Sequence, residues 1–566
     1  MRPLLFVLAS VLIASAADRR NLECPNTDTH VTFQAPASLE KWEQRKQQLR
    51  LQILSAAGLL PLPAKTPLQP LVYDRLDRDG YSIEKVAIET RPGYWLGGNL
   101  YRPKGKAGKF PAVLHPHGHW NYGRLENQQL CSTPTLAINL ARHGFVVFAY
   151  DMVGYNDTAQ TTHDFSSPEY QLWGFTPLGL QLWNSIRALD FVASLPDVDA
   201  AKLAVTGASG GGTQDFLLTA VDPRVAVSAP VNMVSGIMQG GCVCENAPGL
   251  RVGTNNIEIA AMTAPRPMLM VAATGDWTRN VPREEFPAVR KLYELYGKAN
   301  LVENVQFDAP HNYNKDSRQA VYSFLRKHLR PEEPEFQEKG VNVESLQDML
   351  VFYGRSRPDH ARSFSQLFDE WKAEAAKMQQ SATPAELKQR LALLFEAAGP
   401  SPALGDPIPY KFVDGKGPAV LYLHPDGIAA AEASPHFQKL KADGRAILLI
   451  DAFQTGSAKA ARDRSHRHFL TFNRSDSAAR VQDVQAALHW LGAKRPAETL
   501  EVAAERDAQW WALFGAATTT VPVRFNVAPI AFKVSDEDLA KVFFVPGLQR
   551  AGGVEAAAKI LKVSGR

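Results

Sequence analysis

The chain has 566 residues, of which 45% are hydrophobic and 21% charged, and a formal net charge of +4 at pH 7. This length exceeds what one hydrophobic core ordinarily supports, so we expect at least two domains. The composition excludes an intrinsically disordered chain. The small net charge, without a basic block interleaved with aromatics, argues against nucleic-acid binding.

The N-terminus predicts a secretory signal peptide over residues 1–17. Arg2 supplies the positive start, residues 4–13 form the apolar core, and Ala14 and Ala16 give a small-x-small cleavage pattern. The apolar run is too short to span a membrane, although a retained N-terminal anchor is the alternative. No other apolar run reaches membrane length, so we expect a secreted or periplasmic protein without a membrane attachment after cleavage.

Helix-like and strand-like segments alternate after the signal peptide. The strands from residue 110 onward are apolar throughout, which is typical of a mostly parallel sheet covered by helices on both faces. The predicted helices are 38–57, 136–142, 178–194, 213–219 and 318–329. The predicted strands are 81–90, 94–103, 144–155, 203–205, 265–275 and 302–314, together with a strand that enters a histidine and glycine loop over 110–120.

The sequence divides into three parts after the signal peptide. Residues 18–330 carry the alternating pattern, and residues 331–380 are charged and mostly helical, as in a connector. Residues 381–566 repeat four segments of the first part in the same order; GPAVLYLHPDG, for example, resembles FPAVLHPHGHW. We interpret this last part as a degenerate second copy of the first domain.

Residues 203–216, LAVTGASGGGTQDF, have the pattern of a nucleophile elbow. A strand, a sharp turn and a helix follow one another, with Ser209 at the apex between Gly207 and Gly211. The strand and helix of such a turn pass so close that side chains at the flanking positions would clash. No Gly-Lys-Ser/Thr follows, so the stretch is not a phosphate loop. The pattern predicts an α/β-hydrolase fold.

The second copy has lost this pattern. Residues 504–508, Ala-Glu-Arg-Asp-Ala, stand where the first copy has Gly-Ala-Ser-Gly-Gly. With both glycines and the serine gone, we expect neither the strained turn nor a nucleophile there. The second copy is therefore predicted to be inactive.

A serine hydroxyl needs a base, and the base needs an acid that orients it. In α/β-hydrolases the three follow in the order Ser, Asp or Glu, His, on loops after successive strands. Asp276 follows the strand 265–275, and His311 lies in the loop that ends the last strand segment, 302–314. We predict Ser209, Asp276 and His311 as a catalytic triad.

Other acids and histidines compete for these roles. Asp308 lies near His311 and is an alternative acid. Asp151 also follows a strand, but its counterpart Asp451 persists in the inactive copy, which favours a structural role such as binding loop amides. The histidines at 115, 117 and 119 come too early in the chain for the base.

Two backbone N–H groups are needed to stabilise an oxyanion. We predict the N–H of Gly210, at the start of the elbow helix, and the N–H of His119, with Gly118 allowing the close approach of the backbone. The alternative is that the histidines of this loop only cap the preceding strand.

Four cysteines are present: Cys24, Cys131, Cys242 and Cys244. In an oxidising compartment they allow three pairings, and we expect at least one structural disulfide that involves Cys242 or Cys244. A Cys-x-Cys without a second ligand pair or clustered histidines is a weak zinc signal. We therefore predict no metal and no organic cofactor.

The motifs HPHGHW, YDMVGY, VTGASGGGTQ, GDWT and APHNYN resemble the acetyl xylan esterase-like branch of secreted bacterial α/β-hydrolases, close to dienelactone hydrolase and prolyl oligopeptidase relatives. The resemblance covers residues 40–329. It implies a hydrolase of carboxylic esters, such as acetyl groups on plant polysaccharide, with the triad above. One departure is that the oxyanion loop reads His-Gly-His, with His119 where typical esterases carry an aromatic.

Two other functions remain as alternatives. A prolyl oligopeptidase-like peptidase would use the same triad, although no propeller of repeated strands is visible. A non-catalytic carbohydrate-binding protein would have two inert halves. For the second copy we hypothesise that it packs over the active site, on the basis of Trp490, Trp510 and Trp511. The oligomeric state does not follow from the sequence.

Overall fold

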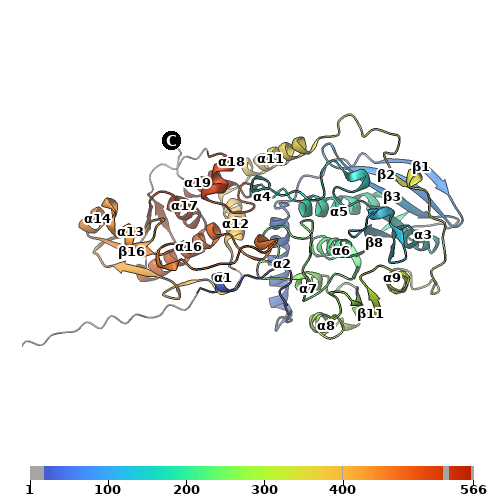
Figure 1. The fold of residues 1–566 in the computed structure, drawn as a ribbon, viewed down its shortest axis with the longest axis horizontal. Coiled ribbons are helices and arrows are strands. Elements are labelled where there is room, and N and C mark those ends of the chain that lie inside the picture. The colour runs from blue at the N-terminus through green and yellow to red at the C-terminus, as the bar shows by residue number, and fades with distance from the viewer. Residues whose placement is uncertain (1–17, 398, 497, 527–533, 563–566) are drawn as a thin grey trace, which may run out of the picture.

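The computed structural model describes residues 18–566 except 398, 497, 527–533 and 563–566 (Figure 1). The predicted signal peptide, 1–17, lies outside the described residues. No helix in the described part of the chain is both long and apolar enough to cross a membrane.

The first domain is built on a nine-stranded sheet in the order β1-β2-β3-β7-β4-β8-β9-β10-β11. The first three strands run antiparallel to their neighbours, and β7 through β11 are parallel. Their bounds are β1 Leu71–Asp77, β2 Tyr81–Arg91, β3 Tyr94–Pro103, β4 Phe110–Pro116, β7 Val146–Tyr150, β8 Val198–Ala208, β9 Val225–Val231, β10 Met268–Gly275 and β11 Val302–Pro310. This is the mostly parallel sheet of an α/β-hydrolase, as the sequence predicts.

Helices cover both faces of this sheet (Figure 1). Strand β7 shows why its residues are all apolar: Val146 and Phe148 enter the hydrophobic cluster on one face, and Val147 and Ala149 enter the cluster on the other. Helices α3 (Thr133–Arg142) and α9 (Lys315–Leu329) pack on the second face. The first face is covered by α2 (Leu39–Ala56), α5 (Pro177–Ser194), α6 (Gly210–Val221) and α8 (Glu285–Leu295).

The second domain has a five-stranded sheet in the order β14-β16-β15-β17-β18. Strand β14 is antiparallel to β16, and the others are parallel, so order and direction match β3-β7-β4-β8-β9 of the first sheet. The strands are β14 Tyr410–Val413, β15 Gly417–Leu423, β16 Arg445–Ile450, β17 Leu500–Ala504 and β18 Val523–Phe525. Helices α12 (Pro384–Phe395), α16 (Asp476–Lys494), α17 (Ala508–Thr518) and α19 (Gly553–Leu561) pack around them.

The expected loss of the second elbow turn is only half right. Between β17 and α17, Arg506 has a φ of 49°, close to the 58° of Ser209 between β8 and α6. The position of the elbow residue therefore keeps a positive φ without glycine or serine. Arg506 is instead held by an ion pair of 2.9 Å with Asp426, on the loop after β15.

The tryptophans that motivated the packing hypothesis lie inside the second domain. Trp510 and Trp511 belong to its hydrophobic core, and Trp490 packs against Tyr410 and Phe412. They support the second fold and give no evidence of a cover over the first domain's site.

The connector joins the two cores. Helix α11 (Phe364–Gln380) buries Trp371 in the first domain's core. The guanidinium groups of Arg91 and Arg550 lie 4.6 and 4.7 Å from the centre of the Trp371 ring, and both bind Glu374. Leu172, from the first domain, is buried in the second domain's core.

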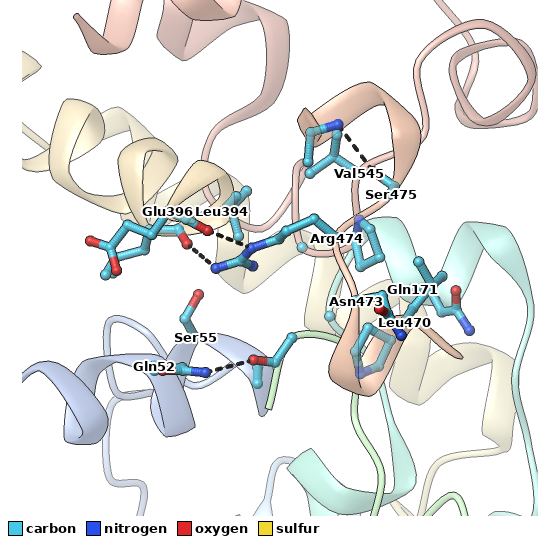
Figure 2. A pocket seen from close by; sticks show the side chains of 18 of the residues that line it. Gln52, Ser55, Gln171, Leu394, Glu396, Leu470, Asn473, Arg474, Ser475 and Val545 are labelled. Atoms are coloured by element: carbon cyan, nitrogen blue, oxygen red, sulfur yellow. Dashed lines mark hydrogen bonds between the residues drawn. The ribbon is translucent and has the colours of Figure 1, made fainter. Parts of the chain in front are cut away.

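A pocket also lies between the domains, bordered by α2, α12 and the segment before α16 (Figure 2). Arg474 donates to the carbonyls of Leu393 and Glu396 there, each at 3.0 Å, and Gln52 donates to the carbonyl of Gly249 at 3.0 Å. Each of these bonds stays within one domain. The two domains are joined at this pocket by backbone hydrogen bonds from Gly249 N–H to the Leu470 carbonyl, at 2.8 Å, and from Gly547 N–H to the Gln171 carbonyl, at 2.7 Å. None of the predicted triad residues lines it.

Candidate active site

Ser209 occupies the sharp turn between β8 and α6, with φ 58° and ψ −125°. The flanking glycines are required by the close approach of β4: a Cβ on Gly207 would lie 2.5 Å from the Pro116 carbonyl oxygen, and one on Gly211 would lie 2.9 Å from the His117 carbonyl carbon. The backbone geometry is that of a nucleophile elbow.

The predicted acid and base meet at the ends of neighbouring strands. Asp276 follows β10, His311 follows β11, and His311 Nδ1 lies 2.8 Å from Asp276 Oδ2. The other carboxylate oxygen, Oδ1, accepts the Thr278 N–H at 2.7 Å and its hydroxyl at 2.5 Å. Asp276 is thereby held in one orientation and is almost fully buried.

Two tryptophans hold the His311 ring. Its centre lies 4.3 Å from that of Trp277 and 5.9 Å from that of Trp120, which stacks on it. Trp277 is fixed in turn by donating its indole N–H to the Asn232 carbonyl at 3.1 Å. Within the described part of the chain, His311 Nε2 has no hydrogen-bond partner. The ring therefore presents a free nitrogen on the side away from Asp276.

Gly118 connects this histidine to the serine. A Cβ on Gly118 would lie 3.1 Å from Ser209 Cβ and 3.1 Å from the indole nitrogen of Trp120. Since Trp120 stacks on His311, the serine, the tryptophan and the histidine border one site. Both tryptophans lie in motifs near the predicted site residues, HPHGHW and GDWT, but nothing in their local pattern indicates that they flank the histidine.

The competing acids lie elsewhere. Asp308 is exposed and accepts a hydrogen bond from Thr274 at 2.5 Å. Asp151 is buried, accepts the N–H of Asp157 at 3.0 Å, and pairs with Arg124. Burial raises the pKa of Asp151 to about 6, against the effect of Arg124. Both acids bind other partners, and the carboxylate that pairs with His311 is that of Asp276.

The neighbouring histidines are buried and tied to backbone groups. His115 contacts the Thr206 carbonyl at 2.8 Å, and burial lowers its pKa to about 4. His117 Nε2 accepts the Met152 N–H at 2.9 Å, and burial lowers the pKa of His117 to about 3. The neutral ring of His115 therefore joins β4 to β8, and that of His117 joins the loop after β4 to the loop after β7.

The two predicted oxyanion donors belong to segments in direct contact. A Cβ on Gly210 would lie 2.7 Å from Cε1 and 3.0 Å from Nδ1 of the His119 ring. Gly210 also begins α6, where the free N–H groups and the helix dipole favour negative charge. The arrangement provides the elements of acyl transfer by a serine hydrolase.

Comparison with known proteins agrees with this geometry. Residues 85–234 match the family model "Acetyl xylan esterase (AXE1)". The chain belongs to the acetyl xylan esterase-like group of α/β-hydrolases. It is thus a carboxylic ester hydrolase.

Individual relatives of this esterase were also found. It is 26% identical to the putative hydrolase YtaP of Bacillus subtilis over 51% of this chain and 99% of YtaP. It is 27% identical to the acetyl esterase Axe7A of Xylanibacter ruminicola, over 27% of this chain and 36% of Axe7A. Among solved structures, methylesterase BT1017 is 30% identical, with a TM-score of 0.48, over 61% of this chain and 78% of that chain.

The expectations for the cysteines of this esterase were wrong. All four are free thiols, so neither Cys242 nor Cys244 forms a disulfide. The prediction that no histidines cluster with the Cys-x-Cys pair also fails, because His119 and His163 lie beside it. The histidines are far from the two cysteines in the sequence, so no local spacing indicates that the four residues form a cluster. The signal that could have found them is topological: all follow strands whose carboxyl ends lie at one edge of the sheet.

Proposed function

We propose that this chain is a secreted serine esterase that cleaves carbohydrate esters by a Ser209–His311–Asp276 triad. The observation that carries the proposal is the Asp276–His311 pair with His311 Nε2 unpartnered, on the same site as the elbow serine. Localisation outside the cytoplasm is supported by the N-terminal sequence pattern.

The mechanism follows from these groups. His311 Nε2 removes the proton of Ser209 Oγ as the oxygen attacks the ester carbonyl, and Asp276 stabilises the imidazolium that forms. The N–H groups of Gly210 and His119 donate to the carbonyl oxygen as its negative charge develops. His311 then protonates the leaving alcohol, and a water molecule that His311 activates releases the acid from Ser209.

The aromatic side chains beside His311 favour a carbohydrate ester as the substrate. Trp120 and Trp277 flank His311 and offer aromatic surface on which sugar rings stack. The similar proteins include one named as an acetyl esterase and one named as a methylesterase. We therefore propose acetylated or methyl-esterified polysaccharide as the substrate, with the acetyl ester first.

A panel of acetyl, methyl and feruloyl carbohydrate esters tests the proposal. The wild type should hydrolyse at least one, and Ser209→Ala should reduce kcat by about 10⁴-fold or more, since the nucleophile is lost. Ser365→Ala, on an exposed helix position, is the matched control and should retain full activity. Hydrolysis of prolyl peptides with no ester cleavage would contradict the proposal, as would undiminished activity in Ser209→Ala.

A further inference from the structure

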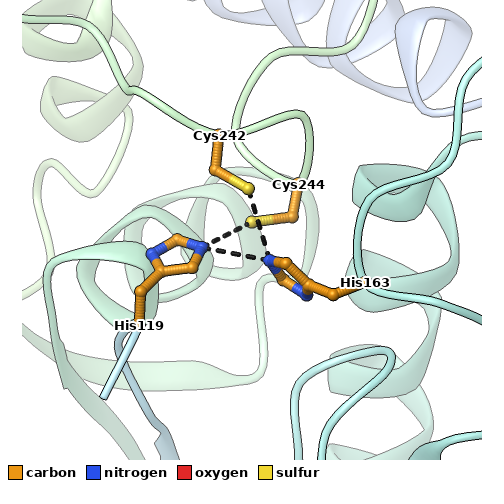
Figure 3. A group of neighbouring side chains, drawn as sticks. All are labelled: His119, His163, Cys242 and Cys244. Atoms are coloured by element: carbon orange, nitrogen blue, oxygen red, sulfur yellow. Dashed lines mark hydrogen bonds between the residues drawn. The ribbon is translucent and has the colours of Figure 1, made fainter. Parts of the chain in front are cut away.

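Four potential metal ligands from three loops converge beside the elbow (Figure 3). His119 lies on the loop after β4, His163 on the loop after β7, and Cys242 and Cys244 on the loop after β9. Their ligand atoms all lie within 4.8 Å of one another. The parent strands are near neighbours in the sheet, so these loops leave the same edge.

The distances fit a tetrahedral ion. The Nε2 atoms of His119 and His163 are 3.2 Å apart, His119 Nε2 is 3.1 Å from Cys244 Sγ, and His163 Nε2 is 3.3 Å from Cys242 Sγ. Zinc with Zn–N bonds of about 2.0–2.1 Å and Zn–S bonds of about 2.3 Å holds its ligand atoms about 3.3–3.8 Å apart. The four side chains need only small adjustments to reach that geometry.

The groups behind the ligands are those of a metal site. His163 Nδ1 lies 2.7 Å from the Val153 carbonyl, so Nδ1 carries the proton and Nε2 presents its lone pair to the cluster. The buried Glu245 carboxylate accepts the N–H groups of Gly241 and Cys242, each at 3.0 Å, and holds the cysteine loop in place. In known metal proteins, hydrogen-bond partners of this kind fix the orientation of the side chains that coordinate the metal.

Cysteine binds metal as the thiolate. A buried thiol such as that of Cys244 loses its proton when a cation binds, since the metal charge replaces the lost solvation.

We propose that His119, His163, Cys242 and Cys244 bind one zinc ion that joins the three loops over the nucleophile elbow. The donor set of two imidazoles and two thiolates suits zinc and excludes the oxygen-preferring magnesium and calcium. Four protein ligands leave no open position, so the ion holds structure and does not activate water.

The ion has a consequence for the proposed esterase mechanism, and this step rests on that proposed function. The His119 side chain is a ligand, while its backbone N–H is one of the two proposed oxyanion donors. Fixing the ring therefore fixes the N–H relative to Ser209 and Gly210. His119 acts through its position, and the zinc never contacts the substrate.

Metal analysis of the full chain, produced with zinc in the medium, tests the site directly. We expect about one zinc per chain. Cobalt in its place should give the intense visible bands of a tetrahedral centre together with thiolate-to-cobalt absorption. The double variant Cys242→Ser/Cys244→Ser should fall to less than about one tenth of the wild-type metal content. Cys24→Ser, a free cysteine outside the cluster, should keep it.

Two results would overturn the site: wild type without stoichiometric zinc and without cobalt bands, or the double serine variant retaining full metal. The cobalt spectrum of the wild type does not depend on the folding of any variant. Ser209→Ala should also hold one zinc per chain, so a failure of the catalytic proposal leaves the metal result intact.

The positioning role has its own readout. Folded His163→Asn enzyme, checked by circular dichroism, should lose kcat by about 10²-fold with KM within about threefold, because a displaced oxyanion donor acts in the transition state. His30→Gln, at an exposed histidine, is the control and should leave both constants unchanged. A metal-free variant with unchanged kcat would overturn the positioning role.

Discussion

His311 and Asp276 lie 2.8 Å apart across the ends of two adjacent strands, and the Thr278 N–H and hydroxyl hold the other oxygen of the carboxylate. Asp276→Asn keeps the shape of the side chain, but the amide can donate a hydrogen bond to His311 Nδ1. It then favours the tautomer whose proton is on Nε2, which cannot act as the base. We expect kcat to fall by about 10⁴-fold with the fold unchanged. Steady-state kinetics on the best ester of the panel, with a melting curve for each protein, measures this.

Asp308→Asn is the matched control for that substitution. Asp308 lies three positions before His311 in the sequence. It is exposed and accepts a hydrogen bond from the Thr274 hydroxyl. The variant should keep kcat within about twofold of the wild type, since a surface substitution away from the site has little effect. A larger loss in Asp308→Asn than in Asp276→Asn would reverse the assignment of the acid.

Gly118 provides a steric test of the loop beside the serine. A Cβ there would meet the Ala208 carbonyl at 2.7 Å and Ser209 Cβ at 3.1 Å. Gly118→Ala should therefore displace the loop, cost about 1–3 kcal/mol in the free energy of unfolding, and reduce kcat. Urea titration and ester kinetics measure the two effects. Gly340→Ala, where a Cβ meets nothing within 4 Å, should change neither; equal behaviour of the two variants would contradict the prediction.

Arg124 is a buried arginine whose guanidinium group binds two carboxylates. It pairs with Asp151 and, at 2.6 Å, with Asp157, and it donates to Asn99 at 3.0 Å. Arg124→Met leaves two carboxylates buried without their partner, which should cost about 3–5 kcal/mol in the free energy of unfolding. Chemical denaturation followed by fluorescence measures this. The exposed pair of Arg75 gives the comparison, and Arg75→Met should cost less than about 1 kcal/mol.

The sequence predicts the framework of the first domain because its signals are local. Ser38 begins α2 and Gly58, at φ 65°, follows its end, as the capping pattern indicates. The elbow is recognisable because sterics dictate its glycines. Strand β9, by contrast, was missed: VAVSAPV is short and interrupted by proline, and only its place between β8 and β10 defines it.

The sequence does not show which side chains of different loops meet in space. His119 and His163 follow different strands, and nothing in their local pattern shows that they meet Cys242 and Cys244. The expected disulfide was a reasonable inference from compartment and count, but pairing depends on where side chains point. Arg506 shows the converse: a positive φ persists at the elbow position although the glycines that would indicate the turn are absent.

Asp215 predicts a pH dependence of stability. It is buried on α6 and accepts hydrogen bonds from Ser228 at 2.5 Å and from the Ala229 N–H at 3.1 Å. Burial raises the pKa of Asp215 well above its ordinary value. The folded state therefore keeps the proton after the unfolded state has lost it, and this group makes stability fall as pH rises above the unfolded pKa, until pH passes the folded pKa.

Asp215→Asn removes that titration while resembling the protonated acid. Relative to the wild type, the variant should gain stability as pH rises above the ordinary pKa of an aspartate, about 4, at up to about 1.4 kcal/mol per pH unit until the pH passes the raised pKa of Asp215. Urea midpoints of both proteins across this range measure the difference. A difference that is constant with pH would contradict the raised pKa, whatever its size. Asp222→Asn, whose carboxylate pairs with Arg224, is a control that should not show this gain.

The retained turn at Arg506 offers a test of the second copy. Its φ of 49° is costly for any side chain with a Cβ, while glycine adopts it freely. Arg506→Gly and Arg506→Ala both lose the ion pair with Asp426, so their comparison isolates the backbone. We expect the glycine variant to be the more stable, by up to about 1 kcal/mol. Within α17, Ala512→Gly should show the opposite sign, costing about 1 kcal/mol. Urea denaturation measures all three, and a more stable Arg506→Ala would show that the turn is not strained.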